Sequence, residues 1–508
     1  MDASLYKEIK FIEQGGESSI DEIIEITKKQ DKINEKTTKC LNQIPDKSSR
    51  KLKGSSLPQE LLDFINLPGN HSLLIKGRPG TGKTIFSLSL IKELKNKQKC
   101  IYLTSRVSKR DILHQYPWLK EDELLTPGEE ILRDLRLTTP SQAIKEIFDL
   151  LRSASCVVID SWDYFAGLMS QEDRDKAEVS LISSACALGS FIIFVGEREE
   201  ISSLDHLVDG IVNLQKIEIE GRLVREISLE KLRGVRIRRV KYIFTLHNGI
   251  FRCSKPWRWK LIPENQRKLS EQIPPKENGL LPSMIEGLDD ILGGGWMKSS
   301  INLLEVYEGV GSRYISFLVP SGQAYLQRGG SLIDLPSSAF RGTDIVDNFV
   351  KGYISPEPEL RLRFILPPPS AEKIGGKYVL PLYLKDPEEA ANQFISYCEG
   401  LIRRSIDNTL YMIIGLDTLE NELGPEGALE FLYHVGSWVK TNDVFCFVIL
   451  KEGQKIPRRV VHLADTHFKI IPRGGGVIFY GIVPETGAMI LETSFEEGYP
   501  KAQLIPID

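Results

Sequence analysis

The chain has 508 residues, of which 41% are hydrophobic and 26% charged, as is typical of a globular protein with two large domains or three smaller ones. Its net charge of −4 excludes a polycation that binds nucleic acid through overall charge. No apolar run approaches the length of a membrane span, and no signal peptide opens the chain. The seven cysteines form no Cys-x-x-Cys pair, so we expect reduced thiols in a cytoplasmic protein.

The first 56 residues are rich in Lys, Glu, Asp, Ser and Gln. We expect a charged mobile arm that ends in a basic linker over residues 47–56. Residues 20–33 carry isoleucines at helical spacing, which predicts one short amphipathic helix. This helix could bind a partner, or the arm could be a solvated tail without a role.

A glycine-rich loop follows a short helix predicted over residues 57–67 and an apolar strand over residues 73–75. Strand, glycine-rich turn, Lys-Thr and helix form the context that a P-loop needs. We expect Lys83 to reach the β- and γ-phosphates of ATP and the hydroxyl of Thr84 to hold Mg²⁺. The predicted phosphate-binding residues are Gly77, Arg78, Pro79, Gly80, Thr81, Gly82, Lys83 and Thr84. The alternative is a glycine-rich turn with a stray lysine.

Strands and helices alternate after this loop. The predicted strands cover residues 99–103, 156–160 and 191–195, and a helix is predicted over residues 143–151. This alternation predicts an α/β fold with a parallel, doubly wound sheet. Asp160 ends an apolar strand, which is the position of a Walker B carboxylate, and we expect it to act with Thr84 at the metal.

From residue 204 the pattern changes to hairpins. Residues 207–212 and 225–229 are predicted to form one hairpin, and residues 242–251, with Asn248-Gly249 as the turn, a second. Between them lies the sequence Lys231-Leu232-Arg233-Gly234. The basic residues that follow, up to Lys241, could form a basic surface hairpin or contact DNA.

The P-loop, the Walker B strand and the segments DHLVDGIVNLQ, ISLEKLRG and YIFTLHNGIF resemble the KaiC group of RecA-like ATPases. The resemblance implies four catalytic residues: Lys83 and Asp160 at the chain's own nucleotide, and Lys231 and Arg233 at the nucleotide of a neighbouring subunit. Action on a neighbour's nucleotide would require an oligomer such as a hexamer.

The residue that activates water is not evident from the sequence. KaiC-type ATPases carry a glutamate pair where this chain has Thr104-Ser105-Arg106, and a hydroxyl is a poor general base. We therefore expect ATP binding with slow hydrolysis, with Asp163 and Glu197 as candidate substitutes.

The pattern restarts after a linker predicted over residues 257–279. The segment IEGLDDILGGGW resembles the entry of a KaiC-type domain, residues 412–417 mirror the Walker B strand, and His462-Leu463-Ala464-Asp465 mirrors His206-Leu207-Val208-Asp209. In the second phosphate loop, Ser312 stands at the lysine position and Arg313 replaces the Ser/Thr. We expect tandem RecA-like (KaiC-type) domains over residues 57–256 and 280–508, with mostly parallel sheets and a degenerate second copy.

A narrower resemblance covers residues 57–251 and extends more weakly into the second half. The segments LPQELLDFINLPG, LLIKGRPGTGKTIFSLSLI, IYLTSRVSKRDIL and VVIDSWDYF resemble the archaeal gas-vesicle regulatory proteins of the GvpD family. The resemblance implies repression of gas-vesicle formation, or of a similar transcriptional programme, by nucleotide-gated binding of a transcription activator. The predicted partner-binding stretch is arginine-rich and covers residues 222–239: Arg222, Arg225, Arg233, Arg236, Arg238 and Arg239.

The alternative function is a KaiC/RecA-like ring ATPase in signalling or DNA metabolism. A recombinase needs DNA-binding loops and a filament-forming motif, and neither is identifiable in this chain.

Overall fold

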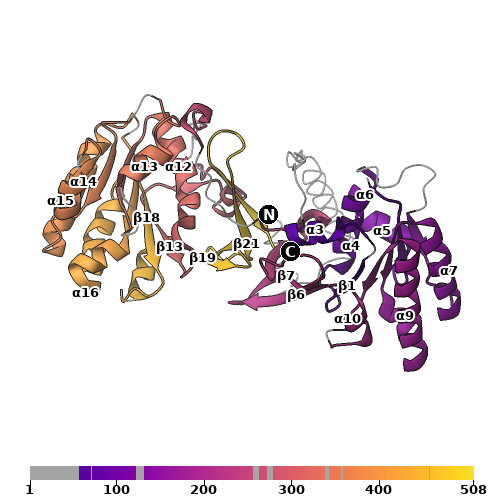
Figure 1. Ribbon diagram of the computed structural model, residues 1–508. Coiled ribbons are helices and arrows are strands. Elements are labelled where there is room, and N and C mark those ends of the chain that lie inside the picture. The colour runs from indigo at the N-terminus through magenta and orange to yellow at the C-terminus, as the bar shows by residue number, and fades with distance from the viewer. Residues whose placement is uncertain are drawn as a thin grey trace, which may run out of the picture. The chain divides into compact units, whose positions relative to one another are not determined.

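The computed structural model describes residues 57–508, apart from residues 70, 96, 122–130, 199, 256–261, 272–278, 338–341, 356–357, 375, 407 and 457. The predicted N-terminal arm with its amphipathic helix, and most of the predicted linker, lie outside the described residues. In the described part the chain forms two large β-sheets, each covered by helices (Figure 1). The described residues include no helix with the length and apolar character that a bilayer crossing needs. The six cysteines of this part are free thiols, and Cys40 lies outside it.

The first sheet has the strand order β3-β2-β4-β5-β1-β6-β7-β8-β9. Its parallel strands are β1 (Ser72–Lys76), β2 (Cys100–Thr104), β3 (Leu132–Asp134), β4 (Cys156–Asp160), β5 (Phe191–Val195) and β6 (Gly210–Ile219). Antiparallel strands extend it: β7 (Arg222–Leu232), β8 (Lys241–Thr245) and β9 (Arg252–Cys253). The central strands are apolar runs because helices cover both faces of a parallel sheet.

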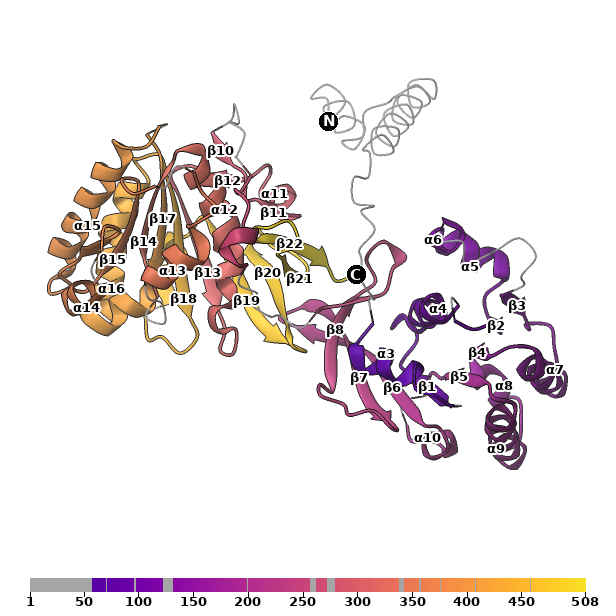
Figure 2. The same cartoon turned by 45° about the horizontal axis from the view of Figure 1, so that its top comes forward.

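Two helical layers enclose this sheet (Figure 2). One face carries α3 (Gln59–Ile65), α4 (Lys83–Leu94), α5 (Lys109–Gln115) and α6 (Trp118–Glu121). The other face carries α7 (Pro140–Ser153), α8 (Trp162–Ala166) and α9 (Gln171–Leu188). Helix α7 begins at a capping box, in which Thr139 and Gln142 satisfy each other's backbone N–H groups.

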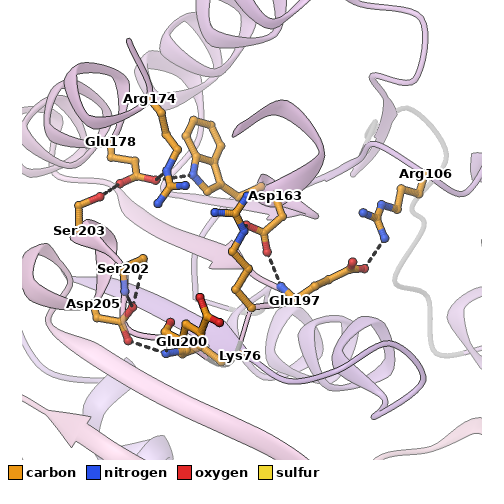
Figure 3. Close-up of polar contacts among 12 residues, drawn as sticks. Lys76, Arg106, Asp163, Arg174, Glu178, Glu197, Glu200, Ser202, Ser203 and Asp205 are labelled. Atoms are coloured by element: carbon orange, nitrogen blue, oxygen red, sulfur yellow. Dashed lines mark hydrogen bonds and ion pairs between the residues drawn. The ribbon is translucent and has the colours of Figure 1, made fainter. Parts of the chain in front are cut away.

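The first predicted hairpin begins later than the sequence pattern indicated. Residues 203–207 form helix α10 (Ser203–Leu207), and the strand begins at Gly210. A buried ion pair holds this helix, because the ammonium of Lys76 lies 2.7 Å from the carboxylate of Asp205, which also accepts a hydrogen bond from the backbone of Ser202 (Figure 3). The second hairpin is confirmed: Asn248 and Gly249 have φ angles of 58° and 69°, and β8 pairs antiparallel with β9.

The second sheet repeats the topology of the first. Its order β15-β14-β17-β18-β13-β19-β20-β21-β22 gives each strand of the first sheet a counterpart in the same place, with β16 and β11 added at the edges. The parallel strands are β13 (Ser300–Val306), β14 (Ser331–Leu335), β15 (Leu362–Leu366), β16 (Val379–Pro381), β17 (Leu410–Gly415), β18 (Val444–Lys451) and β19 (Thr466–Arg473). The antiparallel strands are β20 (Gly476–Val483), β21 (Met489–Ser494) and β22 (Lys501–Pro506), and β11 (Ile285–Glu286) pairs parallel with β22.

Helices also cover both faces of the second sheet. One face carries α11 (Leu288–Ile291), α12 (Ile315–Arg328) and α13 (Gly342–Phe349), and the other carries α15 (Pro387–Ile402) and α16 (Leu416–Val439). Smaller elements are α14 (Pro368–Ile374) and a two-stranded sheet of β10 (Leu280–Leu281) and β12 (Trp296–Met297). The predicted fold class, tandem RecA-like α/β domains with mostly parallel central sheets, is confirmed.

Equivalent aspartates mark the duplication at the level of single hydrogen bonds. The carboxylate of Asp209 accepts hydrogen bonds from the backbone N–H of Ser72, at 3.1 Å, and from its hydroxyl. The carboxylate of Asp465 accepts one from the backbone N–H of Ile301 at 2.8 Å. Each aspartate therefore ties the start of a central strand, β1 or β13, to the segment before the next strand of the sheet.

An apolar cluster joins the last strands of the two repeats. Val224 of β7 and Ile243 of β8 pack with residues of β19, β20, β21 and β22, including Ile478, Ile490 and Ile505. Beside this cluster, the guanidinium of Arg222 donates hydrogen bonds of 2.8 Å to two backbone carbonyls of the second repeat. The antiparallel ends of the two repeats therefore share one core.

Candidate nucleotide site

The predicted phosphate loop lies between the end of β1 and the start of α4. Gly77, Gly80 and Gly82 have positive φ angles, and a Cβ at Gly77 would lie 2.4 Å from the carbonyl oxygen of Leu214, so the close approach of this backbone requires glycine. Helix α4 begins at Lys83, which directs a helix N-terminus at the loop.

Lys83 is buried with its ammonium group against the loop. The residue is only 7% exposed. Its Nζ donates hydrogen bonds to the carbonyl of Gly77, at 2.6 Å, and to the carbonyl of Arg78, at 3.0 Å. Burial lowers the pKa of Lys83, and the nearby carboxylates of Glu197 and Asp160 oppose that effect. A cation with only backbone carbonyls as partners in this loop fits a phosphate-binding role.

The structure brings the two predicted metal ligands together. The hydroxyl of Thr84 donates a hydrogen bond of 2.7 Å to Oδ2 of Asp160, which lies at the end of β4. The hydroxyl of Tyr102, on β2, donates to the same oxygen. Burial raises the pKa of Asp160, and these two hydrogen bonds oppose the rise. Hydroxyl and carboxylate oxygens are ligands that Mg²⁺ accepts, so the pair fits a magnesium ion.

Both candidate carboxylates for water activation lie beyond the ends of β4 and β5 (Figure 3). The backbone N–H of Glu197 donates to the carboxylate of Asp163, and the carboxylate of Glu197 forms an ion pair with Arg106. Arg106 belongs to the Thr104-Ser105-Arg106 segment that stands where KaiC-type ATPases carry glutamates. The chain therefore has a carboxylate near Lys83, and an arginine neutralises it.

Lys231 and Arg233 lie at the opposite end of the sheet from the chain's own phosphate loop. Strand β6 runs parallel to β1, and its start, Gly210, pairs with Leu232 of β7, whereas the loop follows the other end of β1. The ammonium of Lys231 donates to the carbonyl of Asp205, and the guanidinium of Arg233 lies 3.1 Å from the carboxylate of Asp209. Neither side chain is thus arranged to act on the nucleotide of its own subunit.

The arginine-rich stretch divides into two groups. Arg222 and Arg225 lie in β7 and bind backbone carbonyls of the second repeat, and Arg239 lies over the ring of Tyr242, 5.4 Å from its centroid. The exposed arginines of the stretch are Arg233, Arg236 and Arg238. The sequence did not distinguish these groups, because the backbone oxygens that Arg222 and Arg225 bind belong to the second repeat, far away in the sequence.

The second phosphate loop is degenerate, as predicted. Ser312 is exposed, and the guanidinium of Arg313 turns back onto its own loop, with Nε 2.8 Å from the carbonyl of Val310. Asp417, the predicted Walker B counterpart, lies in the first turn of α16 rather than at the end of β17, and the ammonium of Lys451 lies 2.9 Å from its carboxylate. The ammonium of Lys451 thus forms an ion pair with the carboxylate that would otherwise bind a metal ion.

Sequence reasoning missed two residues of the first site. Tyr102 sits in an apolar run where a buried tyrosine gives no separate signal. Arg225 donates a hydrogen bond to the carbonyl of Gly80 at 3.2 Å, although the sequence pattern assigned it to a partner-binding surface.

Comparison with known proteins shows what the chain is similar to. Residues 60–254 match the family model described as ATPase: KaiC. The proteins GvpD1 and GvpD2 of Halobacterium salinarum are each 23% identical to the chain; the alignments cover 88% and 84% of this chain, and 96% and 92% of those proteins. The circadian clock oscillator protein KaiC of a Picosynechococcus species is 24% identical over 53% of this chain and 56% of its own length. The chain is thus similar to GvpD1 and GvpD2 over most of its length, and its residues 60–254 resemble the KaiC-type P-loop ATPases.

Proposed function

We propose that this chain is a cytoplasmic regulatory protein that binds Mg-ATP through Gly77–Thr84 and Asp160, and that bound nucleotide controls its affinity for a protein partner. The observation that carries the proposal is the 2.7 Å contact between Thr84 and Asp160 beside the buried ammonium of Lys83. Similarity to GvpD1 and GvpD2 supports a regulatory output. By that resemblance the partner is a transcription activator, and the output is repression of gas-vesicle formation or of a similar programme.

Slow hydrolysis suits this role. The carboxylate of Glu197 is held in an ion pair with Arg106, so it is not free to orient an attacking water. A nucleotide that persists in the site can order the surrounding segments for longer than one that is hydrolysed quickly.

The partner surface that we propose is narrower than the whole stretch 222–239. Arg222, Arg225 and Arg239 are engaged within the chain. Arg236 and Arg238 are exposed, and Arg233 is exposed while it pairs with Asp209. Exposed guanidinium groups are suited to an acidic surface on the partner.

Titration calorimetry with Mg-ATP tests the nucleotide site. We expect saturable binding that Lys83→Ala weakens by roughly a hundredfold or more, because a buried charge-assisted contact to phosphate is lost. Lys176→Ala removes an equal charge from the exposed surface of α9 and should leave the affinity unchanged. Equal affinity for Mg-ATP in the Lys83→Ala variant and the parent chain would show that the loop does not bind phosphate.

Tryptic cleavage tests nucleotide gating without the partner. Arg236 and Arg238 are exposed cleavage sites, and we expect Mg-ATP to change the rate of cutting at these residues in the parent chain. Lys83→Ala should abolish that change. Identical cleavage rates with and without Mg-ATP, in a protein that binds the nucleotide, would separate binding from gating and contradict the switch.

The second candidate function is a KaiC/RecA-like ring ATPase. The observation that favours it is the position of Lys231 and Arg233, at the end of the sheet opposite the chain's own phosphate loop. From this end of the sheet, the two side chains could reach the nucleotide of a neighbouring subunit. Light scattering with Mg-ATP should then show a closed oligomer, and Arg233→Ala should slow phosphate release without weakening ATP binding. A monomer at saturating Mg-ATP would exclude this candidate.

A further inference from the structure

A cavity of about 80 Å³ lies in the second repeat, between α12 and strand β14. It is found on the face of the sheet covered by the helix that corresponds to α4, and the strand that corresponds to β2 supplies one wall. Most of its lining is apolar and includes Leu318, Leu326, Val350, Phe364, Ile413 and Ile449. Ligands of open α/β sheets bind near the carboxyl ends of the strands, where Asp334 and Ile413 of this lining lie.

Two buried acceptor atoms in this lining have no hydrogen-bond partner among the described residues. They are Oδ1 of Asp334, a residue 7% exposed, and Oε1 of Gln323, a residue 4% exposed. The amide nitrogen of Gln323 fixes the orientation of the group, because Nε2 donates a hydrogen bond of 2.7 Å to the carbonyl of Phe349. The free atom of this amide is therefore the oxygen, an acceptor.

A buried carboxyl group without a partner is unusual in a folded protein. Leaving such a group unpaired is unfavourable, and native structures rarely keep one without a reason. The described residues place no lysine, arginine or histidine in ion-pair contact with Asp334, in contrast to Asp417, which pairs with Lys451. Burial raises the pKa of Asp334 to about 7, so it can carry a negative charge near neutral pH when a cation accompanies it.

We propose that this cavity binds a small apolar molecule that carries an ammonium group, with the nitrogen on Asp334 and Gln323 and the hydrocarbon against the apolar walls. An ammonium donates hydrogen bonds and accepts none, so it complements two acceptors, and its charge matches the carboxylate. The volume equals that of only a few heavy atoms, so the cavity encloses the ammonium group and the adjoining part of an alkyl or benzyl group. This site belongs to the second repeat and does not depend on the nucleotide site proposed for the first.

Titration calorimetry on the full chain, with 3-methylbutylamine and benzylamine as probes, tests the proposal. The neutral isostere 3-methylbutanol has the same apolar body and lacks the charge. We expect one saturable site for the amines and at least about tenfold weaker binding of the alcohol. Amine affinity should fall between about pH 8.5 and about pH 5.5, because Asp334 gains a proton while the amine stays charged.

Two variants locate the binding. Asp334→Asn is expected to weaken amine binding at least about tenfold while leaving alcohol binding nearly unchanged. Asp443→Asn removes an exposed carboxylate of the same repeat and should change neither. Equal binding of amine and alcohol, absence of saturable amine binding, or full amine affinity in the Asp334→Asn variant would each overturn the proposal. The amine and alcohol comparison and the pH series use the parent chain, so they decide the question even if a variant does not fold.

Discussion

The guanidinium of Arg225 donates one hydrogen bond to the carbonyl of Gly80 in the phosphate loop and another to the backbone oxygen of Asp508 in the second repeat. Arg225 is only 7% exposed, and burial lowers its pKa while the charge of Asp508 opposes that effect. A single buried side chain of β7 thus contacts both the loop that we expect to bind phosphate and the last strand region of the degenerate copy. The conformation of the loop is therefore linked to the packing of the second repeat.

Arg225→Ala should weaken binding of Mg-ATP about tenfold, because a charge-assisted hydrogen bond to the loop contributes about 1.5 kcal/mol. Arg225→Lys keeps the charge but loses the fork that contacts two carbonyls, and should give an intermediate affinity. The measurement is calorimetric titration of Mg-ATP. Arg152→Ala, on the exposed surface of α7, is the control for removing a guanidinium. An unchanged affinity in both Arg225 variants would mean that the contact with Gly80 has no part in nucleotide binding.

Glu197→Gln should reduce phosphate release from Mg-ATP by about a hundredfold, if Glu197 is the general base, while the affinity for ATP stays the same. Arg106→Ala should act in the opposite direction and raise the rate several-fold, because it frees the carboxylate from its ion pair. Steady-state phosphate release measures both, with Lys83→Ala as the baseline.

The double variant of Arg106→Ala and Glu197→Gln distinguishes this mechanism from a general effect of the arginine. It should show no gain over Glu197→Gln alone. Arg136→Ala, which breaks an exposed pair with Asp134, should leave the rate unchanged. A faster rate in the double variant would assign water activation to another group, such as Asp163.

Asp465→Ala should lower the free energy of unfolding by about 1–3 kcal/mol, because its carboxylate accepts the hydrogen bond from the backbone N–H of Ile301 at the start of β13. Asp209→Ala should have a similar effect at β1. Thermal unfolding followed by circular dichroism measures both. Similar shifts in melting temperature would support equivalent roles in the two repeats, and a neutral Asp465→Ala would contradict them.

Asp334 gives the stability of the chain a dependence on pH. Burial raises its pKa from 3.8 to about 7, so the folded state binds a proton that the unfolded state has lost in this interval. The contribution of Asp334 to the free energy of unfolding is therefore fully present below about pH 4, falls as the pH rises to about 7, and is constant above that value. As the pH rises from about 4 to about 8, the free energy of unfolding of the Asp334→Asn variant should increase by up to about 4 kcal/mol relative to that of the parent chain.

Urea unfolding over this pH range measures the difference, and Asp443→Asn is the matched control. The asparagine variant keeps a buried polar group, so the pH dependence and not the absolute stability is the decisive quantity. Parallel pH profiles of the Asp334→Asn variant and the parent chain would contradict the raised pKa.

Much of the fold could be predicted because its signals are local. The apolar runs of β1, β4 and β5, the glycines of the phosphate loop and the turn at Asn248-Gly249 each act over a few residues. The duplication could be predicted from the two His-Leu-x-Asp segments, whose aspartates hold β1 and β13 in the same way.

Apart from Thr84 and Asp160, the pairing of distant side chains could not be predicted. Tyr102 and Asp160 meet because β2 and β4 are neighbours in the sheet, and Arg106 meets Glu197 because β5 ends beside them. Sequence reasoning identified Glu197 as a candidate base but could not show that Arg106 neutralises it. Similarly, the sequence predicted Arg222 and Arg225 to be surface residues, whereas in the structure they contact the second repeat.

The apolar cluster shared by the two repeats makes the second copy part of the core of the first. Ile478, Ile490 and Ile505 of the second copy cover Val224 and Ile243 of the first, so deletion of the second copy would expose an apolar surface next to Arg225. A substitution in the phosphate loop of the second copy leaves these contacts in place, whereas loss of its last strands removes them. The first copy therefore depends on the second for packing, even though the second has a degenerate phosphate loop of its own.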